Sequence, residues 1–93
     1  MPRYLIERAY GPAEQQAMQN IGQRMKEVAE ESFPDVAWDC SHVVSDETGV
    51  KSYCVYEAPN EQRLREHGDM VRQHTILRIY EIADTVTPAD FTT

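Results

Sequence analysis

The chain has 93 residues, a formal net charge of −7 at pH 7 and a pI of about 4.8. This length allows one hydrophobic core, and 41% hydrophobic with 27% charged residues is ordinary for a globular domain. The acidic balance lacks the positive surface with which proteins bind phosphates, so we expect neither nucleic acid nor a membrane surface as a partner.

The first third of the chain predicts a strand followed by a helix. Residues 3–8 alternate as a short strand does, and Gly11-Pro12 is a turn signal. From Pro12 to about Phe33, good helix formers carry an apolar stripe at helical spacing, formed by Met18, Ile21, Met25 and Val28. Gly22 interrupts this helix at a cost of about 1 kcal/mol relative to alanine. We interpret it as a close approach to the sheet or to a partner.

The middle of the chain predicts a β-hairpin. Residues 36–45 and 51–57 are rich in β-forming side chains and flank the turn-forming residues 46–49. Strand alternation places Tyr53 and Val55 on one face of the second strand, and the residues that follow each of them on the other.

The last third predicts a helix, a strand and a tail. A helix is expected from Pro59 to about Gln73, with Leu64, His67 and Val71 along its inward side. Residues 77–82 alternate again and predict the final strand, whereas residues 85–93 carry no periodic pattern.

This order, βαββαβ, predicts an α+β protein with a ferredoxin-like sandwich. We expect a four-stranded antiparallel sheet with two helices on one face, in a single domain over residues 1–84 followed by a C-terminal tail over residues 85–93. Because two helices can cover only one face, the other face is predicted to meet a second copy. The protein is therefore expected to be a homodimer of the dimeric α+β barrel type.

The N-terminal segment indicates where the protein resides. Arg3, Glu7 and Arg8 interrupt the apolar stretch that a signal peptide needs, and no later apolar run approaches a membrane span. We therefore expect a cytoplasmic protein. In that compartment the two cysteines, Cys40 and Cys54, are expected to be thiols.

The most chemically suggestive residues are Cys40, His42, Cys54 and His67. Cys40 and His42 project from the same face of their strand. One register of the hairpin puts His42 across from Cys54, and a two-residue change brings Cys40 there instead, so all three are expected on one face. Thiolates and imidazoles suit Zn(II), Ni(II) and Cu, although this spacing matches no standard zinc signature.

Structural and enzymatic interpretations use the same residues. A strand cysteine is most often a small buried hydrophobe, and an inward histidine is more often a hydrogen-bonded core residue. As an enzyme, the protein would use His67 as general acid or base in a pocket lined by Trp38 and Tyr56, with Cys54 as nucleophile. Nothing in the spacing fixes such a trio, so we expect binding rather than catalysis.

Four runs carry a family resemblance: residues 2–8, 41–43, 53–61 (YCVYEAPNE) and 64–67 (LREH). They resemble the domain of unknown function 4242 family, whose described members are small nickel-binding proteins with a dimeric ferredoxin-like fold. The resemblance implies Ni(II) binding for sequestration or delivery, with Cys54 and His67 at the family's motif positions. The sequence departs from the family pattern at His42, where tyrosine or phenylalanine is common, and at Gly68, where alanine is usual. These departures imply either that His42 adds a ligand or that the site has changed its use.

Overall fold

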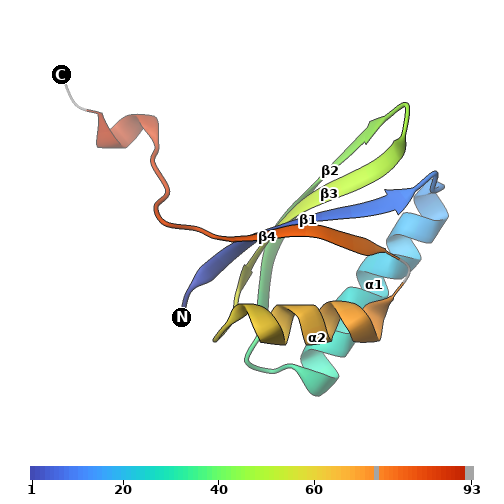
Figure 1. The fold of residues 1–93 in the computed structure, drawn as a ribbon, viewed down its shortest axis with the longest axis horizontal. Helices are drawn as coiled ribbons and strands as arrows, with labels where there is room; N and C mark the ends of the chain where they lie inside the picture. The colour runs from blue at the N-terminus through green and yellow to red at the C-terminus, as the bar shows by residue number, and fades with distance from the viewer. Residues whose placement is uncertain (73, 92–93) are drawn as a thin grey trace.

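The computed structural model describes residues 1–72 and 74–91 and has the predicted order of elements (Figure 1). These are β1 (Arg3–Gly11), α1 (Gln15–Ser32), β2 (Ala37–Asp46), β3 (Gly49–Glu57), α2 (Glu61–Val71), β4 (Thr75–Glu81) and a short 3₁₀ turn, η1 (Pro88–Asp90). The second helix is shorter than predicted because Arg72 adopts a positive φ of 63° directly after Val71. Gln73, where we expected the helix to end, lies outside the described residues.

The four strands form one antiparallel sheet in the order β2-β3-β1-β4. Both helices pack on the same face of this sheet, and the opposite face carries no helix (Figure 1). The predicted ferredoxin-like α+β fold is confirmed. None of the described helices is long and apolar enough to cross a membrane.

The core lies between the helices and the two central strands. Inward side chains of β1 and β3 alternate with outward ones, as period two requires. The helices add residues at three- and four-residue spacing, as predicted. The buried strand residues are Tyr4, Ile6, Arg8, Ser52, Cys54 and Tyr56, and those of the helix stripes are Ile21, Met25, Val28, Leu64, His67 and Val71.

Arg63 fastens α2 to the loop between α1 and β2. Its guanidinium donates two hydrogen bonds to the carboxylate of Asp35, at 3.0 and 2.9 Å, and lies 4.4 Å from the ring centroid of Phe33. A planar, two-pronged ion pair of this kind fixes geometry better than a single contact does. Phe33 is thereby held over the buried side of α2.

The tail leaves the body of the domain after β4 and ends in η1 (Figure 1). It is joined to β1 by a hydrogen bond from the Ile82 amide to the Arg3 carbonyl at 2.8 Å. Val86 and Phe91 in the tail are exposed. Thr92 and Thr93, the end of the predicted tail, lie outside the described residues.

Gly22 does not mark a close approach to the sheet, so that half of the interpretation is wrong, whereas a close approach to a partner stays a prediction. A Cβ atom built at Gly22 would meet no heavy atom of a packed neighbour within 4 Å. At Gly68, by contrast, a Cβ atom would lie 2.7 Å from Cδ1 of Ile76. The two helical glycines therefore differ in whether the fold has room for a side chain.

We predict that Gly22→Ala stabilises the protein by about 1 kcal/mol, because alanine loses less backbone entropy and meets free space. Gly68→Ala is the matched control. There the same gain is opposed by displacement of Ile76, so its effect should be smaller or of opposite sign. Urea unfolding of both variants measures the difference, and equal stabilisation would contradict the packing described here.

Candidate functional site

The register of the β2–β3 hairpin separates the predicted ligands. Asp46 pairs with Gly49, so Ser41 pairs with Cys54 and His42 pairs with Tyr53. This register differs by one residue from the one that would set His42 across from Cys54. Because a one-residue shift moves side chains to the other face, the predicted grouping of Cys40, His42 and Cys54 on one face is wrong.

A β-bulge between Trp38 and Cys40 breaks the alternation of side chains along β2, so that residues before and after it with the same parity face opposite sides of the sheet. Trp38 pairs with Tyr56 and faces the helices, whereas Cys40, two residues later, faces away from them. The Trp38 and Tyr56 rings stack with centroids 6.3 Å apart. Asp39, at the bulge, forms an ion pair with Arg3 at 3.1 Å.

Cys40 and His42 both lie exposed on the helix-free face of the sheet, at its β2 edge. The structure therefore brings this pair together, as strand alternation predicted. Strand pairing places them at the ends of two rows that cross the sheet. The apolar row consists of Cys40, Val55, Leu5 and Tyr80, and the polar row of His42, Tyr53, Glu7 and Arg78.

Hydrogen bonds order the side chains of these rows. The Tyr53 hydroxyl donates to Oε2 of Glu7 at 2.8 Å, and Nη1 of Arg78 donates to the Tyr80 hydroxyl at 2.9 Å. The bond to Glu7 raises the pKa of Tyr53, so this phenol stays protonated at neutral pH. His42 and Cys40 are the soft or borderline donors at the margin of this ordered surface.

Cys54 and His67 lie on the other side of the sheet, inside the core, with exposures of 1% and 0%. Sγ of Cys54 shares a hydrogen bond with Oγ of Ser52 at 3.2 Å. Nε2 of His67 lies 3.0 Å from the Met25 carbonyl, which can only accept, so Nε2 carries the proton. Nδ1 of His67 is then a bare acceptor with no partner in the described part of the chain.

Aromatic rings fill the space around His67. Its ring lies 5.6 Å from that of Phe33 and 5.8 Å from that of Tyr56, measured between centroids. Burial lowers the pKa of His67, and the positive charge of Arg8 lowers it further, although the bond to Met25 opposes both. His67 is therefore a neutral core residue at neutral pH, and the best-formed cavities in the described part of the chain are lined by other residues.

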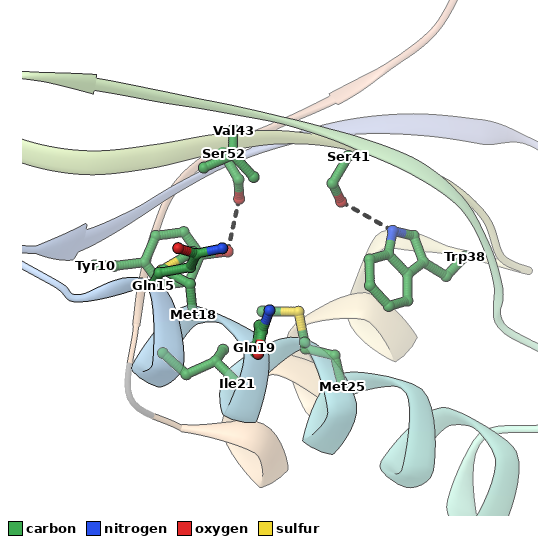
Figure 2. A pocket seen from close by; sticks show the side chains of 11 residues that line it. Tyr10, Gln15, Met18, Gln19, Ile21, Met25, Trp38, Ser41, Val43 and Ser52 are labelled. Carbon is green, nitrogen blue, oxygen red and sulfur yellow. Dashed lines mark hydrogen bonds between the residues drawn. The ribbon is translucent and has the colours of Figure 1, made fainter.

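A cavity of about 350 Å³ lies instead between α1 and the β2–β3 side of the sheet (Figure 2). Trp38 lines this cavity, whereas Tyr56 is fully buried and does not. Figure 2 shows Tyr10 and Ser52 at one end and Trp38 at the other, with Met18, Ile21 and Met25 of α1 across from them.

The sequence reasoning missed a buried polar cluster beside this cavity, formed by Arg8, Tyr10, Ser52 and Tyr56. The hydroxyls of Tyr10 and Ser52 are 2.6 Å apart, and Nη1 of Arg8 donates to the Tyr56 hydroxyl at 3.4 Å. Burial raises the pKa of Tyr56 to about 12. A signal was present: Arg8 has the same strand parity as Tyr4 and Ile6, which point inward.

The fold and the two sites together define a small ferredoxin-like α+β protein with exposed Cys and His donors on its open face. The family model described as nickel responsive protein SCO4226-like matches residues 4–82, so the chain belongs to that family. The resemblance noted in the sequence is confirmed at the level of a nickel-responsive family. No curated protein and no solved structure matches the chain.

We predict that stability falls as the pH falls below 6.5, the ordinary pKa of histidine. The unfolded chain then binds a proton at His67 that the folded chain resists, at up to about 1.4 kcal/mol per pH unit until the lowered folded pKa is reached. Urea unfolding in chelator between about pH 7.5 and pH 5.5 measures this slope. Asp35 and Asp46, whose pKa values are lowered, lose their contribution only near and below 3.8.

His67→Gln should reduce that slope. Burial also lowers the pKa of His74, so His74→Gln is the matched variant that accounts for the remaining part. A slope in His67→Gln equal to that of the unaltered protein would contradict the assignment to His67.

Proposed function

We propose that the protein binds Ni(II) as a homodimer, with Cys40 and His42 of each copy as ligands, and that it sequesters or delivers this metal. Membership of a nickel-responsive family supports the choice of metal. The observation that carries the proposal is the exposure of a thiol and an imidazole two residues apart on one strand face. Such nitrogen and sulfur donors suit Ni(II).

The two candidate pairs differ in how well they suit a metal. Cys40 and His42 are exposed on a surface that an ion can reach. Cys54 and His67, the family's motif positions, are buried, and Cys54 is hydrogen-bonded to Ser52 while His67 donates to Met25. A metal would have to displace the bond between Cys54 and Ser52 and open the core to reach the bare Nδ1 of His67. The exposed pair is therefore the better candidate, and the buried pair is better explained as packing.

A single copy offers too few ligands. Within residues 1–72 and 74–91, no group of three or more His, Cys, Asp and Glu side chains lies close enough together to hold a metal ion. Structural and transport sites for such metals use about four protein ligands. Two copies related by a two-fold axis beside β2 would supply two thiols and two imidazoles, because an isologous contact presents the same patch twice.

The open face itself supports the dimer. Its apolar row runs across the whole sheet, and Tyr80 and Val44 on this face are exposed large hydrophobic residues. An uncovered apolar sheet face of this kind marks an interaction site. A second copy is its natural occupant, since the same row on both copies can pack face to face.

The metal test is a calorimetric titration of tag-free, reduced apo-protein with Ni(II). We expect one Ni(II) per two chains, and loss of binding in Cys40→Ser and in His42→Ala. Zn(II) and Cu are titrated alongside, because ligand type alone does not separate them from Ni(II).

Cys54→Ala and His67→Gln are the matched controls for the metal test. They should keep Ni(II) binding while losing stability, by about 1–3 kcal/mol where a buried polar partner is stranded. Loss of Ni(II) binding in the buried variants but not in the exposed ones would transfer the site to the core. If neither the unaltered protein nor any variant binds Ni(II), Zn(II) or Cu stoichiometrically, the proposed metal function is refuted.

The dimer test is sedimentation of Val55→Arg, which places a charge in the middle of the apolar row. We expect this variant to be monomeric because a buried, unpaired charge opposes association. Met70→Arg is the control, because Met70 is exposed on α2, away from the open face. This variant should stay dimeric. A dimeric Val55→Arg variant would contradict the proposed interface.

A further inference from the structure

Arg8 is a charged side chain buried without an ionic partner. Its exposure is 0%, yet only Nη1 has a hydrogen-bond partner, the Tyr56 hydroxyl at a long 3.4 Å. Nε and Nη2 of Arg8 have no partner among the described residues. Guanidinium groups stay charged in proteins, and a buried charge is strongly unfavourable unless an anion compensates it.

The neighbours of Arg8 do not supply that anion. Burial raises the pKa values of Tyr10 and Tyr56, so both phenols are neutral at neutral pH. The positive charge of Arg8 also lowers the pKa values of His67 and His74. A histidine is neutral or positively charged, so neither of them is an anion. None of the ion pairs formed in the described part of the chain includes Arg8.

The cavity beneath α1 ends beside this uncompensated charge. Arg8 pairs directly with Ser52 across β1 and β3, and Tyr10 follows it two residues later. Tyr10 and Ser52, joined at 2.6 Å, form the polar end of the cavity (Figure 2). The guanidinium is not part of the cavity wall, but its positive charge acts on the Tyr10 phenol, which is part of that wall. The remaining walls are largely apolar: Met18, Ile21, Met25, Trp38 and Val43.

Gly22 keeps the cavity open. It lines the cavity, and a Cβ atom at this position would meet no packed neighbour within 4 Å. A larger residue here would project from α1 into the space. The glycine that is unfavourable for the helix is thus useful for the cavity.

We propose that this cavity binds a small carboxylate with an apolar body. The carboxylate accepts from the one hydroxyl of the Tyr10–Ser52 pair whose proton is not used in the bond between them, and it is attracted by the charge of Arg8, which acts strongly in a low-dielectric interior. The apolar body lies between Trp38 and the methionines of α1. A volume of about 350 Å³ is at the small end of the range for ligand pockets, which restricts the ligand to one alkyl chain of medium length or one ring. The site lies across the sheet from Cys40 and His42, so it is independent of the proposed metal.

The test uses Trp38, the single tryptophan of the chain, as a fluorescent reporter. Full-length, metal-free protein is titrated with octanoate and, separately, with 1-octanol, which has the same chain length without the charge. We expect saturable fluorescence changes, with octanoate binding about tenfold or more tightly than 1-octanol. Equal affinities would overturn the proposal and leave an apolar site without preference for an anion. No saturable change with octanoate would overturn it and leave a cavity that holds solvent only.

Two pairs of variants locate the site. Arg8→Met keeps the length of the side chain and should remove the preference for octanoate. If Arg8→Met does not fold, Ser52→Ala replaces it. This variant removes a hydroxyl instead of a charge and should reduce the preference for octanoate over 1-octanol. Gly22→Leu should abolish binding of both probes, whereas Gln23→Leu, which puts the same residue at the next, exposed position of α1, should not. Binding that survives Gly22→Leu in a folded protein would overturn the location.

Discussion

Two helices cover one face of a four-stranded sheet and leave the other face open. This constraint decides which of the cysteine and histidine side chains on the sheet and helices are buried and which are exposed. Beneath the helices, strand side chains must pack, so Cys54 and His67 became core residues with hydrogen-bond partners in the chain itself. On the open face, side chains remain reachable, so Cys40 and His42 are exposed. The exposed thiol–imidazole pair and the buried one therefore lie on opposite sides of one sheet.

The sequence was sufficient to predict the elements and most of the core. Helical spacing identified Ile21, Met25, Leu64 and Val71 correctly, because a 3.6-residue period is strong over a long helix. The inward direction of His67 was also predicted and is confirmed. These features depend on neighbours close in sequence, which a single chain displays directly.

The register of β2 could not be predicted from sequence in the same way. Almost all residues of this edge strand are exposed, so its pattern carries no buried face from which to fix the pairing. The turn, where Asp46 pairs with Gly49, and the bulge at Asp39 decide it. Arg8 was missed for a different reason: a charge at an inward strand position is rarely buried, so parity was outweighed by residue type.

The bulge at Asp39 separates the two ends of β2 in a way that bears on how such a protein can evolve. Trp38 lies over the core while Cys40 and His42 lie outside it, although strict alternation would put them together. An insertion or deletion of one residue at an edge strand can thus turn a donor from interior to exterior while the hairpin and the core keep their pairing. Within this fold, the insertion or deletion of a single codon would then be enough to gain or lose surface ligands, without a change in the strand pairing of the rest of the sheet.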